Sequence, residues 1–489
     1  MKFAARHGFE LAVVAAAGSM LWTAQAFACY GIPCAPSTCV AVGAAMTHSA
    51  GPTATPLPTS GTLSSVPISR NMTLLAQMPL ATIGGGTAGA SLCCCFDPLT
   101  KREYALMGRT NGTAVIDMTN PRAPKYVANI PSAGSNTSWR EPKVFQNTVY
   151  IGVDGGTHRL QYADLTQVRN YTGTTLTLGY GTFGGTFNGS IPTNIHTLQI
   201  NPDSGYLYLS GTSINSGAPL MVNVNNPSAP VAAGVVTSLD GYSHEAQVVT
   251  YHGPDPAYQG REIMLSSNGK QGTAVDTFSI VDVTNKAATQ RLSSKTYTGA
   301  GYIHQGWLTE DQRYFFQNDE LDEQAGTTGN PVHTRSHLWD VSSLSNPIYK
   351  GFIDLPTTSI DHNMYVKDGF LFETNYTTGL RMFKIGDLSS SDSSQWLTEV
   401  AYYDTYAAND GATFNGAWNN YPYFPSGNIP ISDINGGLFI VQPNVSGWAL
   451  NPWDPRGGGN GGTPVNSPEP ASMGLLLGAA VLGIGRRRR

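Results

Sequence analysis

Four histidines recur at a nearly constant interval through the middle of this chain of 489 residues. They are His196, His244, His304 and His362, and successive members are 48, 60 and 58 residues apart. Imidazole nitrogens with carboxylate oxygens beside them are ligands that suit a divalent transition-metal ion. Such an ion would bind a ligand, or would lower the pKa of a water molecule enough for hydrolysis. The pattern therefore predicts a metal site, provided that the fold brings these four positions together.

Polar residues stand directly beside three of these histidines, at positions 245, 305 and 361. The candidate binding site therefore consists of His196, His244, Glu245, His304, Gln305, Asp361 and His362. The alternative is structural, because buried imidazoles can simply satisfy main-chain groups or ordered water. The sequence contains no nucleophile elbow, zinc-protease helix or phosphate-binding loop, so catalytic residues stay unassigned.

A run of acidic residues lies between the third and fourth of these histidines. Asp319, Glu320, Asp322 and Glu323 offer oxygen ligands of the kind that Ca²⁺ prefers. The run matches no Ca²⁺ loop pattern, and we interpret it as a solvated loop.

A repeated element must position all of these residues. An apolar strand ending in Asp or Asn recurs with its polar anchor at positions 117, 164, 223, 282 and 340, at intervals of 47, 59, 59 and 58 residues. Looser copies follow near residues 380–385 and 438–441, and Asp-Gly or Ser-Gly hairpin signals precede several copies. This period is typical of a four-stranded propeller blade with long loops. Seven copies predict an all-β protein with a seven-bladed β-propeller, with six blades or an array of β-sandwiches as alternatives.

The propeller hypothesis is what brings the histidines together. The first strand of every blade lines the central channel, so equivalent positions in successive blades converge on one ring at a channel mouth. The four histidines are expected to be neighbours in that ring.

The repeated body resembles the LVIVD-repeat proteins of the choice-of-anchor B family over about residues 104–443. The stretches that carry the resemblance are residues 138–143, 251–255, 304–311, 318–323 and 414–418. The resemblance implies a shared body joined to different C-terminal anchors. It implies no particular chemistry, because the family has no assigned activity to carry over.

Both ends of the chain are typical of export. The start is weakly basic, residues 11–22 are mostly apolar, and small residues follow at positions 24, 26 and 28. Cys29 after that cleavage site would also fit lipid attachment, but Ala26 stands where such sites usually carry Leu. The C-terminal end resembles the PEP-CTERM sorting signal, with Pro468, Glu469 and Pro470 before an apolar stretch and four arginines.

That resemblance implies processing by an exosortase-type enzyme. The apolar stretch, residues 471–485, is shorter than the ~20 residues that a stable spanning helix needs. The chain would contact the membrane only through this tail before processing, and a permanent tail anchor is the alternative. The expected organisation is a signal peptide (1–28), a Cys-containing arm and linker (29–90), the propeller (91–445), a Gly/Pro/Asn-rich linker (446–466) and the sorting signal (467–489).

The six cysteines all lie near the N-terminus, at Cys29, Cys34, Cys39, Cys93, Cys94 and Cys95. We interpret them as disulfide candidates, because exported proteins meet an oxidising compartment. A metal site is the alternative, but the Cys-x-x-Cys spacing common in zinc sites is missing.

Composition narrows the class of partner. The net charge of −5 gives no overall basic surface, which argues against nucleic acid as a partner. The chain is expected to be an exported, surface-anchored binding or scaffold module for an extracellular polysaccharide or surface protein. The alternative is a metal-dependent, hydrolase-like enzyme that uses the histidine-rich site.

Overall fold

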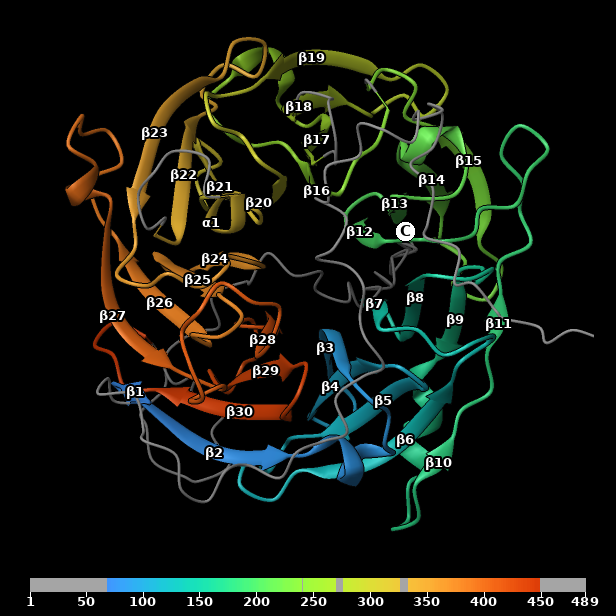
Figure 1. The fold of residues 1–489 in the computed structure, drawn as a ribbon. Coiled ribbons are helices and arrows are strands. Elements are labelled where there is room, and N and C mark those ends of the chain that lie inside the picture. Colours follow the sequence, from blue (N-terminus) through green and yellow to red (C-terminus); the bar gives the residue numbers. More distant parts are fainter. Residues whose placement is uncertain (1–67, 240, 270–275, 326–332, 449–489) are drawn as a thin grey trace, which may run out of the picture. The chain divides into compact units, whose positions relative to one another are not determined.

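Seven β-sheets surround a common centre in the computed structural model, which describes residues 68–239, 241–269, 276–325 and 333–448 (Figure 1). The protein is a seven-bladed β-propeller, which confirms the predicted fold and the preferred number of blades. The expected signal peptide, the first three cysteines and the expected sorting signal lie outside the described residues. Within the described residues, no helix has the length and apolar character needed to cross a membrane.

The innermost strand of each blade lies at the centre of the ring (Figure 1). In blades 1 to 7, these strands are β3 (Gly89–Asp97), β7 (Trp139–Phe145), β12 (Thr197–Asn201), β16 (Glu245–Thr250), β20 (Ile303–Leu308), β24 (Met364–Lys367) and β28 (Ala417–Asn420). Neighbouring inner strands contact one another from blade 7 through blade 1 to blade 6, and between blades 6 and 7 β28 contacts β25 (Phe370–Thr374). Residues at the starts of these strands are therefore brought together, although they are distant in sequence.

Two further antiparallel strands follow in every blade. The second strands are β4 (Arg102–Arg109), β8 (Thr148–Asp154), β13 (Tyr206–Ser210), β17 (Glu262–Asn268), β21 (Tyr314–Asp319), β25 (Phe370–Thr374) and β29 (Ile429–Asp433). The third strands are β5 (Gly112–Asp117), β9 (Gln161–Asp164), β14 (Leu220–Asn223), β18 (Thr277–Asp282), β22 (Arg335–Asp340), β26 (Leu380–Ile385) and β30 (Gly437–Pro443). Because strands one and two run antiparallel, the end of a second strand lies beside the start of the first.

The repeated Asp or Asn found in the sequence ends the third strand of blades 1 to 5. In each case its side-chain oxygen accepts a hydrogen bond from the main-chain N–H two residues later. The donors are the N–H groups of Thr119, Thr166, Asn225, Thr284 and Ser342. This local turn ends the strand and directs the chain toward the outer strand.

The outer edge of the ring is more varied. The fourth strands are β6 (Lys125–Pro131), β11 (Gly181–Thr182), β15 (Val231–Val235), β19 (Gln290–Lys295), β23 (Ile348–Asp354), β27 (Leu397–Tyr403) and, in blade 7, β2 (Met72–Met78). Two short strands extend this edge, β10 (Leu176–Thr177) parallel to β6 and β1 (Ser69–Arg70) antiparallel to β27. Blade 7 thus combines one strand from before the first blade with three from the end of the propeller.

The pairing of β2 with β30 closes the ring. The propeller therefore begins before residue 91, the boundary expected from the sequence. The physical reason is that an unpaired β30 would leave a row of main-chain groups open at the last blade.

Apolar side chains fill the space between neighbouring blades. In one such contact, Phe278 of β18 stacks on Phe315 of β21, with ring centroids 4.8 Å apart. Within the described residues, helical structure is confined to short segments: α1 (Asp322–Ala325), η2 (Leu80–Ile83), η3 (Leu165–Asn170), η4 (Asn215–Gly217), η5 (Pro256–Tyr258) and η6 (Ser393–Gln395). Most of these segments lie in loops between strands, where they do not interrupt the blades.

Candidate metal centre at the middle of the propeller

The four histidines lie at the starts of four successive inner strands. His196 and His244 immediately precede β12 and β16, His304 is the second residue of β20, and His362 lies two residues before β24. Their rings follow one another across blades 3 to 6, with centroid separations of 4.5, 4.2 and 4.4 Å. The structure therefore brings the four predicted residues together, while their role in binding stays a prediction.

Hydrogen bonds between blades hold this arrangement in register. Thr197 donates its hydroxyl to the main-chain oxygen of His244 at 2.6 Å, which joins blades 3 and 4. The main-chain N–H of Leu308 donates to the Gln247 side chain at 2.8 Å, which joins blades 4 and 5. These buried bonds fix the inner strands relative to one another and so fix the spacing of the imidazoles.

Three of the imidazoles are oriented by a hydrogen bond at Nδ1. His196 Nδ1 donates to the Asp154 carboxylate at 2.8 Å, and His244 Nδ1 donates to the main-chain oxygen of His304 at 3.0 Å. His362 Nδ1 donates to the main-chain oxygen of Trp418 at 2.6 Å. A proton fixed on Nδ1 leaves Nε2 of a neutral imidazole with a lone pair, which is the form that binds metal ions.

The Nε2 atoms face one another or a shared carboxylate. His196 Nε2 lies 2.8 Å from His244 Nε2. Because His244 already donates from Nδ1, its Nε2 is the acceptor in this bond and His196 is the donor. Two imidazole nitrogens aimed at each other are the arrangement that a shared metal ion would replace.

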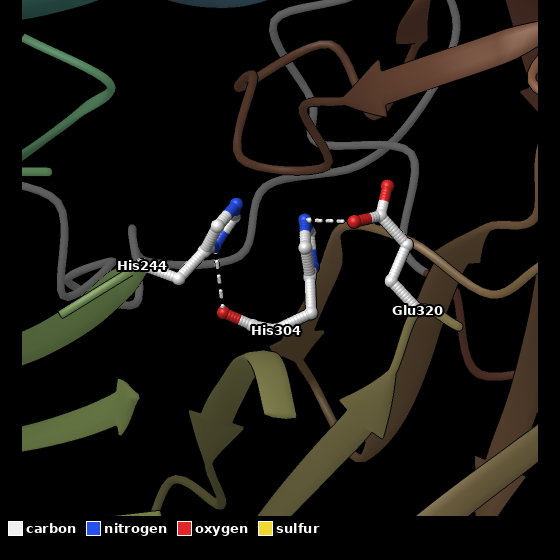
Figure 2. Close-up of side chains that lie close together, drawn as sticks. All are labelled: His244, His304 and Glu320. Atoms are coloured by element: carbon white, nitrogen blue, oxygen red, sulfur yellow. Dashed lines mark hydrogen bonds and ion pairs between the residues drawn. The ribbon is translucent and has the colours of Figure 1, made fainter. Parts of the chain in front are cut away.

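Glu320 completes the cluster (Figure 2). One of its carboxylate oxygens lies 3.7 Å from His304 Nε2, and the other lies 3.5 Å from His362 Nε2. Tyr376 donates its hydroxyl to Glu320 at 2.8 Å. Ligand atoms of His244, His304 and Glu320 all lie within 4.8 Å of one another. In a tetrahedral site, metal–nitrogen distances of about 2.0–2.1 Å place ligand atoms roughly 3.3 Å apart, so these side chains would move closer together around an ion.

The cluster is buried, and burial shifts the pKa values of its members. Burial, followed by repulsion from neighbouring imidazolium charge, holds the pKa of His244 and of His304 well below the usual range. Burial also lowers the pKa of His362 to about 3 and raises that of Glu320 to about 7. Three of the four imidazoles are therefore neutral at pH 7, as metal ligands must be.

His196 differs from the other three. Burial alone would lower its pKa, but the hydrogen bond and charge of Asp154 outweigh burial and raise it. His196 is also the histidine nearest to solvent, with 17% of its side chain exposed and 31% of Asp154. The side of the cluster at blades 2 and 3 is thus the side that a small solute would reach first.

Three of the predicted site residues have other contacts. Gln305 bonds through both ends of its amide to the main chain of Met364, and so joins blades 5 and 6. Burial raises the pKa of Glu245 to about 8, although the positive charge of Lys143 acts in the opposite direction. Asp361 accepts a hydrogen bond from the main-chain N–H of Asp319 at 3.4 Å, away from the imidazole nitrogens that contact Glu320.

The acidic run is not a solvated loop. Asp319 is fully buried, and Asp322 and Glu323 are 5% and 9% exposed. Burial and the charge of Asp319 raise the pKa of Asp322 to about 7. The loop interpretation failed because the run follows the second strand of its blade, whose end lies beside the buried starts of the inner strands.

Sequence reasoning missed Glu320 and Asp154 as partners of the histidines. A common signal was present, because each lies at or directly after the end of a second strand, β21 or β8. Antiparallel pairing puts such a position next to the start of an inner strand, where the histidines are. An acidic residue there was the feature to look for.

Three cysteines are in the described part of the chain, on the inner strand β3. Cys93 and Cys94 are buried, and Cys95 is partly buried. Successive strand residues point to opposite faces, and Cys93 and Cys94 accordingly pack into different apolar clusters. The disulfide assignment stays a prediction, and Cys29, Cys34 and Cys39 lie outside the described residues.

No protein-family model matches the chain, and no curated protein matches it. Among solved structures, the periplasmic gluconolactonase of Pseudomonas aeruginosa is 13% identical with a TM-score of 0.47, over 70% of this chain and 91% of that chain. Hydrazine synthase of Kuenenia stuttgartiensis is 9% identical with a TM-score of 0.46, over 69% and 92%. The Cps50 (Swd1) β-propeller domain of Myceliophteria thermophila is 12% identical with a TM-score of 0.43, over 75% and 99%. These values support no transfer of function.

Proposed function

We propose that this protein is a metal-binding β-propeller that holds a divalent transition-metal ion at its centre. The central ligands are Nε2 atoms of His244 and His304 with the Glu320 carboxylate, whose ligand atoms lie within 4.8 Å of one another, and His196 and His362 flank them. The observation that carries the proposal is the convergence of four imidazoles from four blades, three of them oriented by a hydrogen bond at Nδ1. The nitrogens of His196 and His244 face each other at 2.8 Å in a hydrogen bond that a bound ion would replace.

Nitrogen-rich ligands of this kind favour zinc, copper, iron or nickel over Mg²⁺ and Ca²⁺. When bound, the ion supplies a Lewis acid that can hold an oxygen or nitrogen ligand entering from solvent. The chain itself orients the imidazoles, excludes bulk water and keeps most of the cluster neutral. The resulting activity is metal-dependent binding of a small ligand.

A second candidate function is metal-dependent hydrolysis. Glu320 favours it, because in this second function its buried carboxylate would not bind the ion but would accept a proton from an attacking water molecule beside the imidazole ligands. Only the binding function requires nothing beyond the cluster itself, so we place it first. An assay of hydrolysis of chromogenic esters and phosphoesters, with and without chelator, distinguishes the two.

We also propose that the protein works outside the cytoplasm. The proposal rests on the signal peptide at residues 1–28 and on the sorting signal that contains Pro468, Glu469 and Pro470. An exosortase-type enzyme would process the tail, and the propeller would then face extracellular polysaccharide or surface proteins. Loss of surface display after deletion of residues 467–489 would support this placement, and unchanged display would contradict it.

Metal analysis tests the central proposal. The full chain, purified without chelator, should contain close to one transition-metal ion per molecule by elemental analysis. The double variant His244→Ala/His304→Ala should lose at least nine-tenths of that metal, because it removes two of the converging nitrogens.

The matched control is His252→Ala, which removes an exposed histidine in the loop after β16. This variant should keep its metal. Chelator-treated wild-type chain should also recover about one ion per molecule when incubated with Zn²⁺ or Co²⁺. Equal metal content in the double variant and the wild type would overturn the assignment, and so would failure of the wild type to bind either ion.

A further inference from the structure

A second group of possible ligands lies apart from the imidazole nitrogens and consists of carboxylates alone. It contains Asp322 and Glu323 from the single helical turn α1, and Asp361 from the segment before β24. One oxygen atom from each of the three lies within 4.8 Å of the others. The three side chains come from two neighbouring blades, so the group is assembled by the fold rather than by one loop.

Several of these oxygen atoms are buried and have no hydrogen-bond partner among the residues that the structure describes. They are both carboxylate oxygens of Glu323 and Oδ1 of Asp322 and of Asp361. The three residues are only 5%, 9% and 1% exposed, respectively for Asp322, Glu323 and Asp361. A buried ionised carboxylate without a donor or counter-charge is costly. The described residues do not offset this cost, and a bound cation would.

The surrounding charges do not supply the missing compensation. Among the described residues, Arg335 is the cation paired with the group, at 3.6 Å from Asp322, and it is shared with Asp354 at 2.9 Å. Two further buried carboxylates lie nearby, and they have their own donors. Asp319 accepts from the Tyr297 hydroxyl and the Gly301 N–H, and Glu373 accepts from the Ser336 hydroxyl and the Asn375 amide.

We propose that Asp322, Glu323 and Asp361 bind a Ca²⁺ ion. The ligands are exclusively oxygen atoms, which a hard cation prefers and a thiophilic or imidazole-seeking ion does not. Mg²⁺ keeps several of its water molecules and is usually held by only one or two carboxylates, whereas Ca²⁺ readily accepts a larger number of protein oxygen atoms.

The site is independent of the histidine cluster in its ligands and in its chemistry. Glu320, which contacts the imidazoles, and Asp322 are both in the turn that follows β21, but they face different partners. The Ca²⁺ proposal can therefore be tested, and can be wrong, independently of the transition-metal proposal.

Protons offer the only other compensation, because carboxyl groups that share a proton can bond to one another. The two possibilities differ in their response to Glu323→Gln. An amide in place of Glu323 removes one negative charge and breaks no hydrogen bond seen in the described residues. With a Ca²⁺ site, this variant should be at least as stable as wild type in chelator and less stable than wild type in Ca²⁺. With shared protons, Ca²⁺ should make no difference to either chain.

The decisive experiment is calorimetric titration of Ca²⁺ into the chelator-treated full chain at pH 7. We expect one Ca²⁺ per molecule and at least tenfold weaker binding in both Glu323→Gln and Asp361→Asn. Asp354→Asn is the matched control, since Asp354 pairs with the same Arg335 but half of its side chain is exposed. Its affinity for Ca²⁺ should stay within twofold of wild type. Mg²⁺ should compete only at much higher concentration.

Several outcomes would overturn the proposal. They are the absence of Ca²⁺ binding by wild type, equal binding by the Glu323 and Asp361 variants, and binding of Mg²⁺ as tight as that of Ca²⁺. If a variant does not fold, thermal unfolding of the wild type gives the answer, because Ca²⁺ must raise its Tm above that in chelator. His244→Ala/His304→Ala should bind Ca²⁺ normally, so failure of the transition-metal site would be seen separately.

Discussion

The contact between Asp154 and His196 does two things at once. It fixes the proton of the imidazole on Nδ1, and it supports positive charge on the ring until Nε2 loses its proton to a metal ion. Partners of this kind orient metal ligands and increase their basicity. Asp154 is thus a positioning residue, and it would act on the ion only through His196.

Replacement of Asp154 by Asn should therefore weaken transition-metal binding without removing a ligand. We expect a loss of about 10- to 100-fold in affinity for Zn²⁺ or Co²⁺, measured by competition with a chromophoric chelator. Asp164→Asn is the control, because Asp164 accepts hydrogen bonds from the N–H and the hydroxyl of Thr166 at the start of η3, and Asn can still cap that turn. An unchanged affinity in Asp154→Asn would show that His196 is not a ligand or needs no orientation.

A second residue-scale prediction concerns Asp97, which lies far from the histidine cluster in the first blade. The Arg169 guanidinium bonds to both of its carboxylate oxygens, at 2.8 and 2.9 Å, and holds the pKa of Asp97 at about 2. Because the folded pKa is below that of the unfolded chain, the pair stabilises the fold above about pH 4. This stabilisation is lost as the pH falls from about 4 to 2.

Asp97→Asn should lower the free energy of unfolding at pH 7 by about 1 kcal/mol, a figure that allows for solvent screening of a partly exposed pair. The difference between wild type and variant should shrink toward zero near pH 2. Urea unfolding at pH 7, 4 and 2.5 measures it. A difference that stays constant over this range would mean that the charge of Asp97 contributes nothing.

At the scale of elements, closure of the ring depends on β2. This strand pairs with β30 in the last blade, although more than 350 residues separate their sequences. Leu75 forms the bulge in the pairing and packs with Ile83, Leu438 and Ile440. The strand therefore contributes to the core as well as to the hydrogen-bond ladder.

Leu75→Ala should lower the free energy of unfolding by about 2–3 kcal/mol, as expected for the loss of a buried leucine side chain. The control is Leu99→Ala, which changes a side chain that is 74% exposed and should cost less than about 0.5 kcal/mol. Chemical denaturation of both variants gives the comparison. Similar small losses in both would show that β2 does not hold the ring closed.

The sequence predicted the blades but not the strand pairing that closes the ring. The reason is that the sequence signals for blades are local, whereas ring closure joins distant residues. The Asp or Asn anchors of the third strands act through a bond to the residue two positions later, so each copy carries its signal locally. Pairing of β2 with β30 has no local signal, because its hydrogen bonds join the two ends of the propeller. The first strand was therefore assigned to the arm.

At the scale of the whole molecule, the difference between local sequence signals and long-range contacts also explains which part of the site could be predicted. The histidines occupy equivalent positions in four blades, so the propeller hypothesis alone placed them together. Glu320 belongs to a different position, the end of a second strand, and its neighbours His304 and His362 come from two blades. Only the packing of blade 5 against blade 6 shows that contact. Burial of Asp322 and Glu323 likewise follows from the packing of blades 5 and 6 and could not be predicted from the sequence.

The histidine cluster exists only in the closed ring, because blades 3, 4, 5 and 6 each supply one imidazole. An ion that binds this cluster binds the folded chain far better than the unfolded chain. Binding must then raise the free energy of unfolding, by about 2.7 kcal/mol when the free ion is at 100 times its Kd. Weak binding of ions to histidines of the unfolded chain would reduce this gain.

Urea unfolding of the chelator-treated chain, with and without Zn²⁺, should show that gain in the wild type and in His252→Ala. His244→Ala/His304→Ala should show almost none of it, although its stability in chelator is also expected to change. For each chain, the free energy of unfolding with Zn²⁺ is compared with that without Zn²⁺, so a change in the variant's stability without metal does not affect the result. A gain of equal size in the double variant would place the bound ion elsewhere. No gain in the wild type would mean that the four imidazoles meet for structural reasons alone.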